Sequence, residues 1–108
     1  MSEIVMSFEQ ALKGLIGRAC VVRSDLSGVW GGTITTIDPR GVTMHNARRA
    51  YEWQGPQTCS ELALFGPTGG RICAPVPVTA LIGLIEVIPM SDEAIARWRE
   101  CPVWQKDV

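Results

Sequence analysis

The stretch VWGGTITTIDPRGVTMHN, residues 29–46, decides the fold. Its first half is rich in isoleucine and threonine, and its second half contains valine and threonine in succession. Such β-branched side chains favour the half-buried, pleated surface of a β-strand. Between the halves, DPRG at residues 38–41 places proline second and glycine fourth, as a tight turn prefers. The stretch therefore predicts two antiparallel strands joined by a turn.

Strand signals continue on both sides of this hairpin. ACVVRS (19–24), followed by the turn residues DLSG (25–28), adds a preceding strand and completes a three-stranded meander. ARRAYEW (47–53) fits a strand or a helix, and we favour the strand because tyrosine and tryptophan suit a half-exposed pleat. RICAPVPV (71–78) and TALIGLIEVIP (79–89) predict two more strands, the first an edge or bulged strand because it holds two prolines.

Three short helices complete the pattern. Ser7 and Gln10 form a capping box, and apolar residues at helical spacing follow as far as residue 16. TCSELALFG (58–66) predicts a second helix that ends at its glycine, and SDE (91–93) begins a third that runs to about residue 100. We therefore expect an α+β fold, mainly β: a small antiparallel SH3-like half-barrel with short N-terminal, middle and C-terminal helices.

The composition favours one globular domain spanning residues 1–108. Apolar residues make up 46% of the chain and charged residues 19%, and the net charge is −1. Coating a nucleic acid requires a basic surface, so a nucleic-acid partner is not expected.

Prolines and Glu86 interrupt the apolar run 72–90, so we expect no membrane span. The N-terminus does not resemble a signal peptide, which predicts a cytoplasmic protein.

No motif of an enzyme class occurs in the sequence. His45 is the only histidine, and the four cysteines form no CxxC pair. The glycine-rich GPTGGR (66–71) lacks the lysine and serine or threonine of a phosphate-binding loop. We therefore expect a protein that is not an enzyme, with free thiols, no metal and no cofactor.

The strongest candidate for a binding site lies in HNARRAYEW, residues 45–53. Arginine offers a planar fork of donors that matches phosphate, and aromatic rings offer faces on which a base stacks. In a strand, alternation places Arg49, Tyr51 and Trp53 on one face. The same residue types are enriched at protein interfaces, and Arg48 could instead pair with Glu52. The ligand-binding candidates here are Asn46, Arg48, Arg49, Tyr51 and Trp53.

A second, weaker group flanks the turn at residues 25–28. In a meander the first turn can lie beside the end of the third strand, which would bring this group next to the first one. Its structural alternative is a solvated turn with one tryptophan anchored in the core. The candidates in this group are Arg23, Ser27 and Trp30.

Several segments resemble a family of small proteins of phages and prophages. These are GVWGGTI, NARRAYEW, SELALFG, VIPMSDEAIA and the terminal PVW, and the likeness extends over residues 15–104. Met90 stands where the family usually has cysteine, and Tyr51 where many members have tryptophan. A looser similarity, in size and residue type, links the chain to phage anti-defence sponges, which sequester cyclic nucleotides or cyclic ADP-ribose.

These resemblances imply a non-enzymatic homo-oligomer that holds a small nucleotide signal of bacterial immunity in the host cytoplasm. Arg48 or Arg49 would take the phosphate, Tyr51 and Trp53 would stack, and Asn46 would orient the ligand. One alternative is a protein-interaction module that inhibits a host defence enzyme through the same residues. The other is a small nucleic-acid-binding protein, which the charge balance disfavours.

Overall fold

The fold is α+β and mainly β, as the sequence predicts. The computed structural model describes residues 7–104. The elements are, in order, α1 (Phe8–Lys13), β1 (Ala19–Ser24), β2 (Gly28–Asp38), β3 (Gly41–Gln54), α2 (Cys59–Phe65), β4 (Gly69–Ile72), β5 (Val76–Ile82), β6 (Leu84–Pro89) and α3 (Asp92–Glu100).

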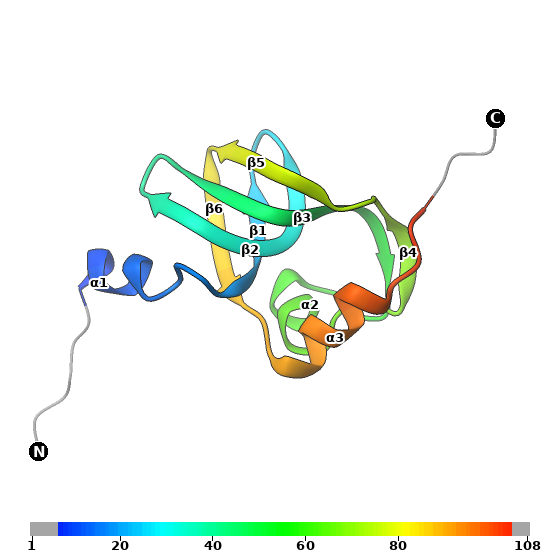
Figure 1. Ribbon diagram of the computed structural model, residues 1–108. Helices are drawn as coiled ribbons and strands as arrows, with labels where there is room; N and C mark the ends of the chain where they lie inside the picture. Colours follow the sequence, from blue (N-terminus) through cyan, green and yellow to red (C-terminus); the bar gives the residue numbers. More distant parts are fainter. Residues whose placement is uncertain (1–6, 105–108) are drawn as a thin grey trace, which may run out of the picture.

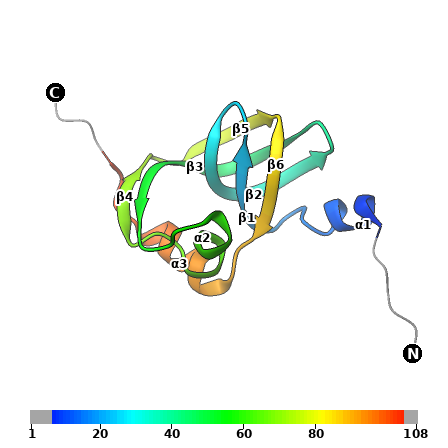
Figure 2. The same cartoon turned by 180° about the vertical axis from the view of Figure 1, so that it is seen from behind.

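The strands form one curved, unclosed sheet. Its order is β4-β3-β2-β1-β6, and β5 pairs with the first half of β3, on a different part of that strand from β4. All five pairings are antiparallel, and the predicted meander of β1, β2 and β3 is confirmed. Helices α2 and α3 lie together below the sheet, whereas α1 projects from the end opposite β4 (Figures 1 and 2).

Two predicted strands are divided differently in the structure. Residues 71–89 contain parts of three strands, because β4 ends at Ile72 and the chain breaks again between β5 and β6. Gly83 makes the second break possible, since its φ of +71° belongs to the left-handed region that other residues avoid. By contrast, residues 47–53 continue β3 without a break, so the strand prediction for ARRAYEW is confirmed.

A bulge in the middle of β3 fixes which side chains face outward. Between the pairs Gly31–Arg48 and Thr33–His45, one residue of β2 faces two residues of β3, Asn46 and Ala47. Asn46 has φ +50°, the only positive φ of a non-glycine residue within residues 7–104. A Cβ on Gly32 would lie 2.8 Å from the Ala47 Cα, so the second glycine of VWGGT makes room for the bulge.

The core has two parts, one on each face of the sheet. Val21, Leu62, Ile72 and Trp98 belong to the part between the sheet and the helices α2 and α3. The other part lies within the curve of the sheet and is formed by residues such as Trp30, Ile34, Met44 and Leu81. Consecutive residues of β1, from Cys20 to Val22, are buried alternately in the two parts.

The helices agree with the sequence analysis at their N-termini. The capping box of Ser7 and Gln10 is formed, and Ser91 caps α3 by accepting from the Ala94 N–H. Helix α1 ends at Lys13, earlier than predicted, and buries none of its residues. No helix within residues 7–104 has the length and apolar character needed to cross a membrane.

Candidate functional site

The predicted ligand-binding residues of β3 do not converge on one surface. After the bulge, Arg48 and Ala50 face the helices and are buried, whereas Arg49 and Tyr51 are exposed on the opposite side. Trp53 packs against the core beside α2 and α3, because the register shifts between Ala50 and Glu52. The expectation that Arg49, Tyr51 and Trp53 share one face is therefore wrong for Trp53.

Arg48 is an internal cross-link. Its side chain donates four hydrogen bonds to backbone carbonyl oxygens: Nε to Cys73 (2.8 Å), Nη1 to Trp98 (2.6 Å) and Cys101 (2.8 Å), and Nη2 to Ile72 (3.4 Å). Two of these carbonyls lie at the C-terminal end of α3, where a cation also interacts favourably with the helix dipole. The guanidinium thus fastens α3 and the end of β4 to the sheet and is not on the outer surface.

The tryptophans of the predicted set are also held by the protein itself. Trp30 is 7% exposed, and its Nε1 donates to the Ser27 carbonyl at 3.1 Å. Trp53 Nε1 donates to the Pro56 carbonyl at 2.7 Å.

Arg23 lies 3.8 Å from Glu86 in an exposed ion pair. The candidates at the turn of residues 25–28 do border those of residues 45–53, because the Arg49 guanidinium lies 4.7 Å from the ring centroid of Trp30.

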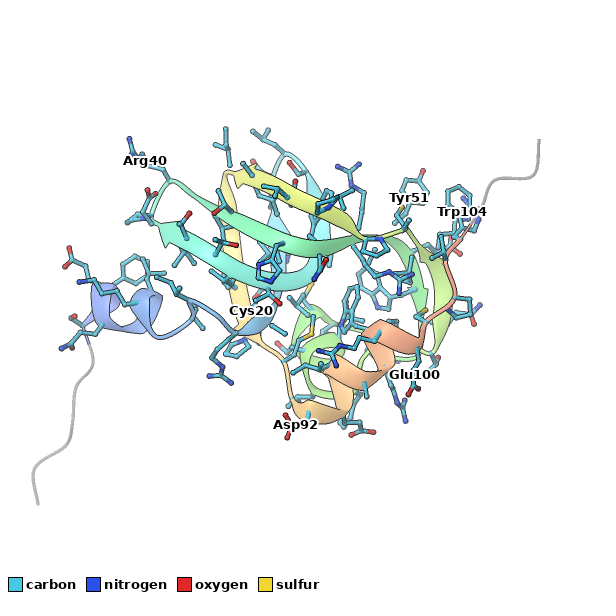
Figure 3. The ribbon with its side chains drawn as sticks, in the orientation of Figure 1. Cys20, Arg40, Tyr51, Asp92, Glu100 and Trp104 are labelled. Atoms are coloured by element: carbon cyan, nitrogen blue, oxygen red, sulfur yellow. The ribbon has the colours of Figure 1, made fainter. Side chains whose placement is uncertain are left out.

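Tyr51 lies beside two residues that sequence reasoning did not select, Arg71 and Trp104, and Arg49 is exposed two positions before it on the same strand. The Arg71 guanidinium lies 5.8 Å from the Tyr51 centroid and 5.3 Å from the Trp104 centroid. The two rings are 6.4 Å apart and nearly parallel, with an interplanar angle of 8° (Figure 3). We call Arg49, Tyr51, Arg71 and Trp104 the arginine–aromatic surface.

Strand β4 and the C-terminal segment bring Arg71 and Trp104 to this surface. Gly70 allows β4 to approach β3, because a Cβ there would lie 2.4 Å from the Glu52 carbonyl oxygen. The Trp104 backbone N–H donates to the Ile72 carbonyl at 2.9 Å, so the C-terminal segment docks on the end of β4. The signal in the sequence was the arginine of GPTGGR and the terminal PVW, but no local spacing joins them to Tyr51.

The arginine–aromatic surface is accessible and carries positive charge. Tyr51 is 67% exposed and Trp104 38% exposed. Arg71 lies 3.7 Å from the Glu52 carboxylate, but both groups are about half exposed, so the ion pair is weak. Within residues 7–104, Arg49 forms no ion pair. The surface therefore offers two guanidinium groups beside two aromatic rings to a planar anion.

Asn46 lies apart from the arginine–aromatic surface. Its side chain is exposed at the bulge and borders a cleft beneath α3, on the side where Arg48 is buried. The structure therefore separates the predicted set into an outer part, Arg49 and Tyr51, and a part near α3, Asn46 and Arg48. Trp30 belongs to the core within the curve of the sheet, and Trp53 packs against the core on the side of the helices.

The cysteines differ in how far burial shields their thiols. All four are free thiols, and Cys20 and Cys101 are buried. Burial raises the pKa of the Cys20 thiol to about 11, so it stays protonated at neutral pH. Burial, assisted by the nearby Glu86 carboxylate, also raises the pKa of Cys59.

The comparison with protein families gives one match. A family model described as a domain of unknown function (DUF6948) covers residues 17–98. The chain belongs to the DUF6948 family. This region includes the sheet, α2 and most of α3, so it holds Arg49, Tyr51 and Arg71 but not Trp104. No curated protein and no solved structure matches the chain significantly.

Proposed function

We propose that this DUF6948 protein is a phage-type, non-enzymatic binding protein that sequesters a cyclic nucleotide or cyclic ADP-ribose signal. The ligand lies on the arginine–aromatic surface. The observation that carries this proposal is the exposed, nearly parallel pair Tyr51 and Trp104, with Arg71 within 6 Å of both rings. The resemblance of NARRAYEW to phage and prophage proteins supports the biological setting.

The chemistry of the surface matches the two parts of a nucleotide. A guanidinium binds phosphate through charge-assisted, bidentate hydrogen bonds. A base stacked on an aromatic side chain contributes about 1–3 kcal/mol. Alternate residues of a strand are separated by about 7 Å, so Arg49 lies within reach of a phosphate whose base stacks on Tyr51. In this proposal Arg49 and Arg71 take the phosphates, and Tyr51 and Trp104 take the bases.

Isothermal titration with cyclic nucleotides and cyclic ADP-ribose isomers tests the proposal. We expect one class of these ligands to bind. Trp104→Ala should raise the Kd of that ligand by about tenfold, because one stacked base is lost. Arg71→Ala should raise it by a similar factor, because one charged hydrogen bond is lost. Tyr51→Phe keeps a ring and should bind nearly as well as the unaltered protein.

Arg40→Ala is the matched control for the arginine variants. Arg40 is an exposed arginine at the β2–β3 turn, and Figure 3 shows it far from Tyr51 and Trp104. Its removal lowers the positive charge by the same amount, so it should leave the Kd unchanged. If the folded protein binds none of the ligands, or if Arg40→Ala weakens binding as much as Arg71→Ala, the proposal is wrong.

A protein-interaction module is the second candidate. Exposed Phe65 and Val103, together with Trp104, supply the apolar and aromatic contacts that protein interfaces favour. This function predicts that the protein retains a host defence enzyme in a pull-down, and that Trp104→Ala abolishes retention while no nucleotide binds.

The proposal includes association of identical subunits through β5. Within the described residues, β5 pairs only with β3, and its segment VPVTALI contains no charged residue. Val78 and Ile82 are 74% and 67% exposed. Pro77 removes one backbone donor from this strand, but the apolar residues on both sides of it leave an edge of the kind that pairs with strands of other chains. The free edge of β6 in a second copy is the partner we propose.

Native mass spectrometry tests this association. We expect an oligomer that Val78→Lys converts to monomers, because a lysine on an edge strand opposes pairing. An unaltered protein that is monomeric at tens of micromolar would contradict the association through β5.

A further inference from the structure

A cleft of about 120 Å³ lies between α3 and the sheet, apart from the arginine–aromatic surface. An engineered apolar cavity of about 150 Å³ holds a benzene molecule, so this cleft has room for one small group but not for a nucleotide. Its border includes Gly31, Thr33, Asn46, Arg48, Trp98 and Arg99.

Trp98 borders the cleft and has an unused hydrogen-bond donor. The residue is 4% exposed, and its Nε1 has no acceptor among the described residues. It is the only buried side-chain N or O atom without a partner within residues 7–104. A buried donor that finds no acceptor is rare in folded proteins. The indole N–H is therefore available to an acceptor other than residues 7–104.

Arg48 brings a buried positive charge that no carboxylate neutralises. The residue is 6% exposed and forms no ion pair within residues 7–104. Its four hydrogen bonds all go to neutral carbonyl groups and leave one Nη2 hydrogen unused. Buried charges in proteins are normally paired. An anion in the cleft that Arg48 borders would supply the missing charge.

The other polar residues of the cleft also suit an anion. Arg99 is exposed at its border and forms no ion pair with the described residues. Asn46, whose φ at the bulge is +50°, adds an exposed side-chain amide. Thr33 adds a hydroxyl, and no aspartate or glutamate of residues 7–104 borders the cleft. The polar side chains around the cleft are thus all able to donate hydrogen bonds.

We infer that this cleft binds a small oxyanion, a carboxylate or phosphate group, that accepts from the Trp98 indole and is neutralised by Arg48 and Arg99. The site does not depend on the proposed nucleotide function, because it uses none of the four residues of the arginine–aromatic surface. Its ligand is a free anion or one anionic group of a larger molecule.

Nuclear magnetic resonance of the indole N–H groups tests this inference. The four tryptophans give four indole signals, and Trp98→Phe identifies the one from Trp98. We expect this signal to move saturably when sodium acetate or inorganic phosphate is added at constant ionic strength. Whichever anion binds more tightly shows whether the cleft prefers a carboxylate or a phosphate. Sodium chloride alone should leave the signal in place.

Variants of exposed residues provide the controls, since they do not threaten folding. Arg99→Ala should raise the apparent Kd by about tenfold, as the loss of one charge-assisted hydrogen bond does. Arg40→Ala and Trp104→Ala should leave it unchanged. The inference is wrong if acetate and phosphate move the Trp98 signal no more than chloride does. It is also wrong if Arg99→Ala and Arg40→Ala have equal effects.

Discussion

Replacement of Arg48 by alanine is expected to lower the free energy of unfolding by about 3–5 kcal/mol, because each buried carbonyl oxygen that loses its donor costs about 1–3 kcal/mol. The substitution removes a donor from four carbonyl oxygens, two of them at the C-terminal end of α3. The Ile72 carbonyl keeps the Trp104 N–H as a second donor, so the loss falls on the carbonyls of Cys73, Trp98 and Cys101. Arg48→Lys keeps the charge but not the planar fork, so it should fall between alanine and arginine. Urea unfolding followed by tryptophan fluorescence measures the change.

Arg49→Ala is the matched control for this prediction. The two arginines are neighbours in β3, but Arg49 is exposed and its described contact is the ring of Trp30. A contact of this kind at an exposed site is worth about 0.5–1 kcal/mol. Equal losses for the two variants, or a loss below about 1 kcal/mol for Arg48→Ala, would contradict the role of Arg48 as an internal cross-link.

Replacement of Gly31 by alanine is expected to cost about 1–3 kcal/mol of folding stability. A Cβ at this position would lie 2.8 Å from three ring atoms of Trp98, which is buried, so the ring or the strand would have to shift. Gly14→Ala is the control, because a Cβ there would meet its nearest atoms at 3.5 Å.

A double substitution separates steric overlap from other effects of Gly31→Ala. The smaller ring of Trp98→Phe should relieve part of the overlap, so the two substitutions together should cost less than the sum of their separate effects. Thermal unfolding of the four proteins measures this coupling. Strict additivity, or a stable Gly31→Ala protein, would show that the first glycine of VWGGT is not required by the indole.

The sheet could be read from the sequence because its signals are local. The β-branched runs and the DPRG turn of residues 29–46 specify strand, turn and strand without help from the rest of the chain. The breaks in residues 71–89 were harder to place. Three prolines and one glycine occur there, and only the folded chain shows that β5 and β6 part at Gly83, where φ is positive.

The candidate site was less predictable because it depends on contacts between distant segments. The bulge at Asn46 reverses the side to which the following residues point, and no residue of NARRAYEW signals it by itself. Arg48 therefore turned out to be buried, next to an exposed Arg49 of the same type. Arg71 and Trp104 join Tyr51 only through the pairing of β4 with β3 and the docking of the C-terminal segment.

The most direct test of nucleotide binding is the indole spectrum of the protein saturated with its tightest-binding cyclic nucleotide. The signal of Trp104 should move most, because a base stacks on its ring, and that of Trp53 should stay, because its N–H is bound to Pro56 inside the protein. If the Trp104 signal stays in place, the arginine–aromatic surface does not hold the ligand. That conclusion follows both when no indole signal moves and when only the Trp98 signal moves.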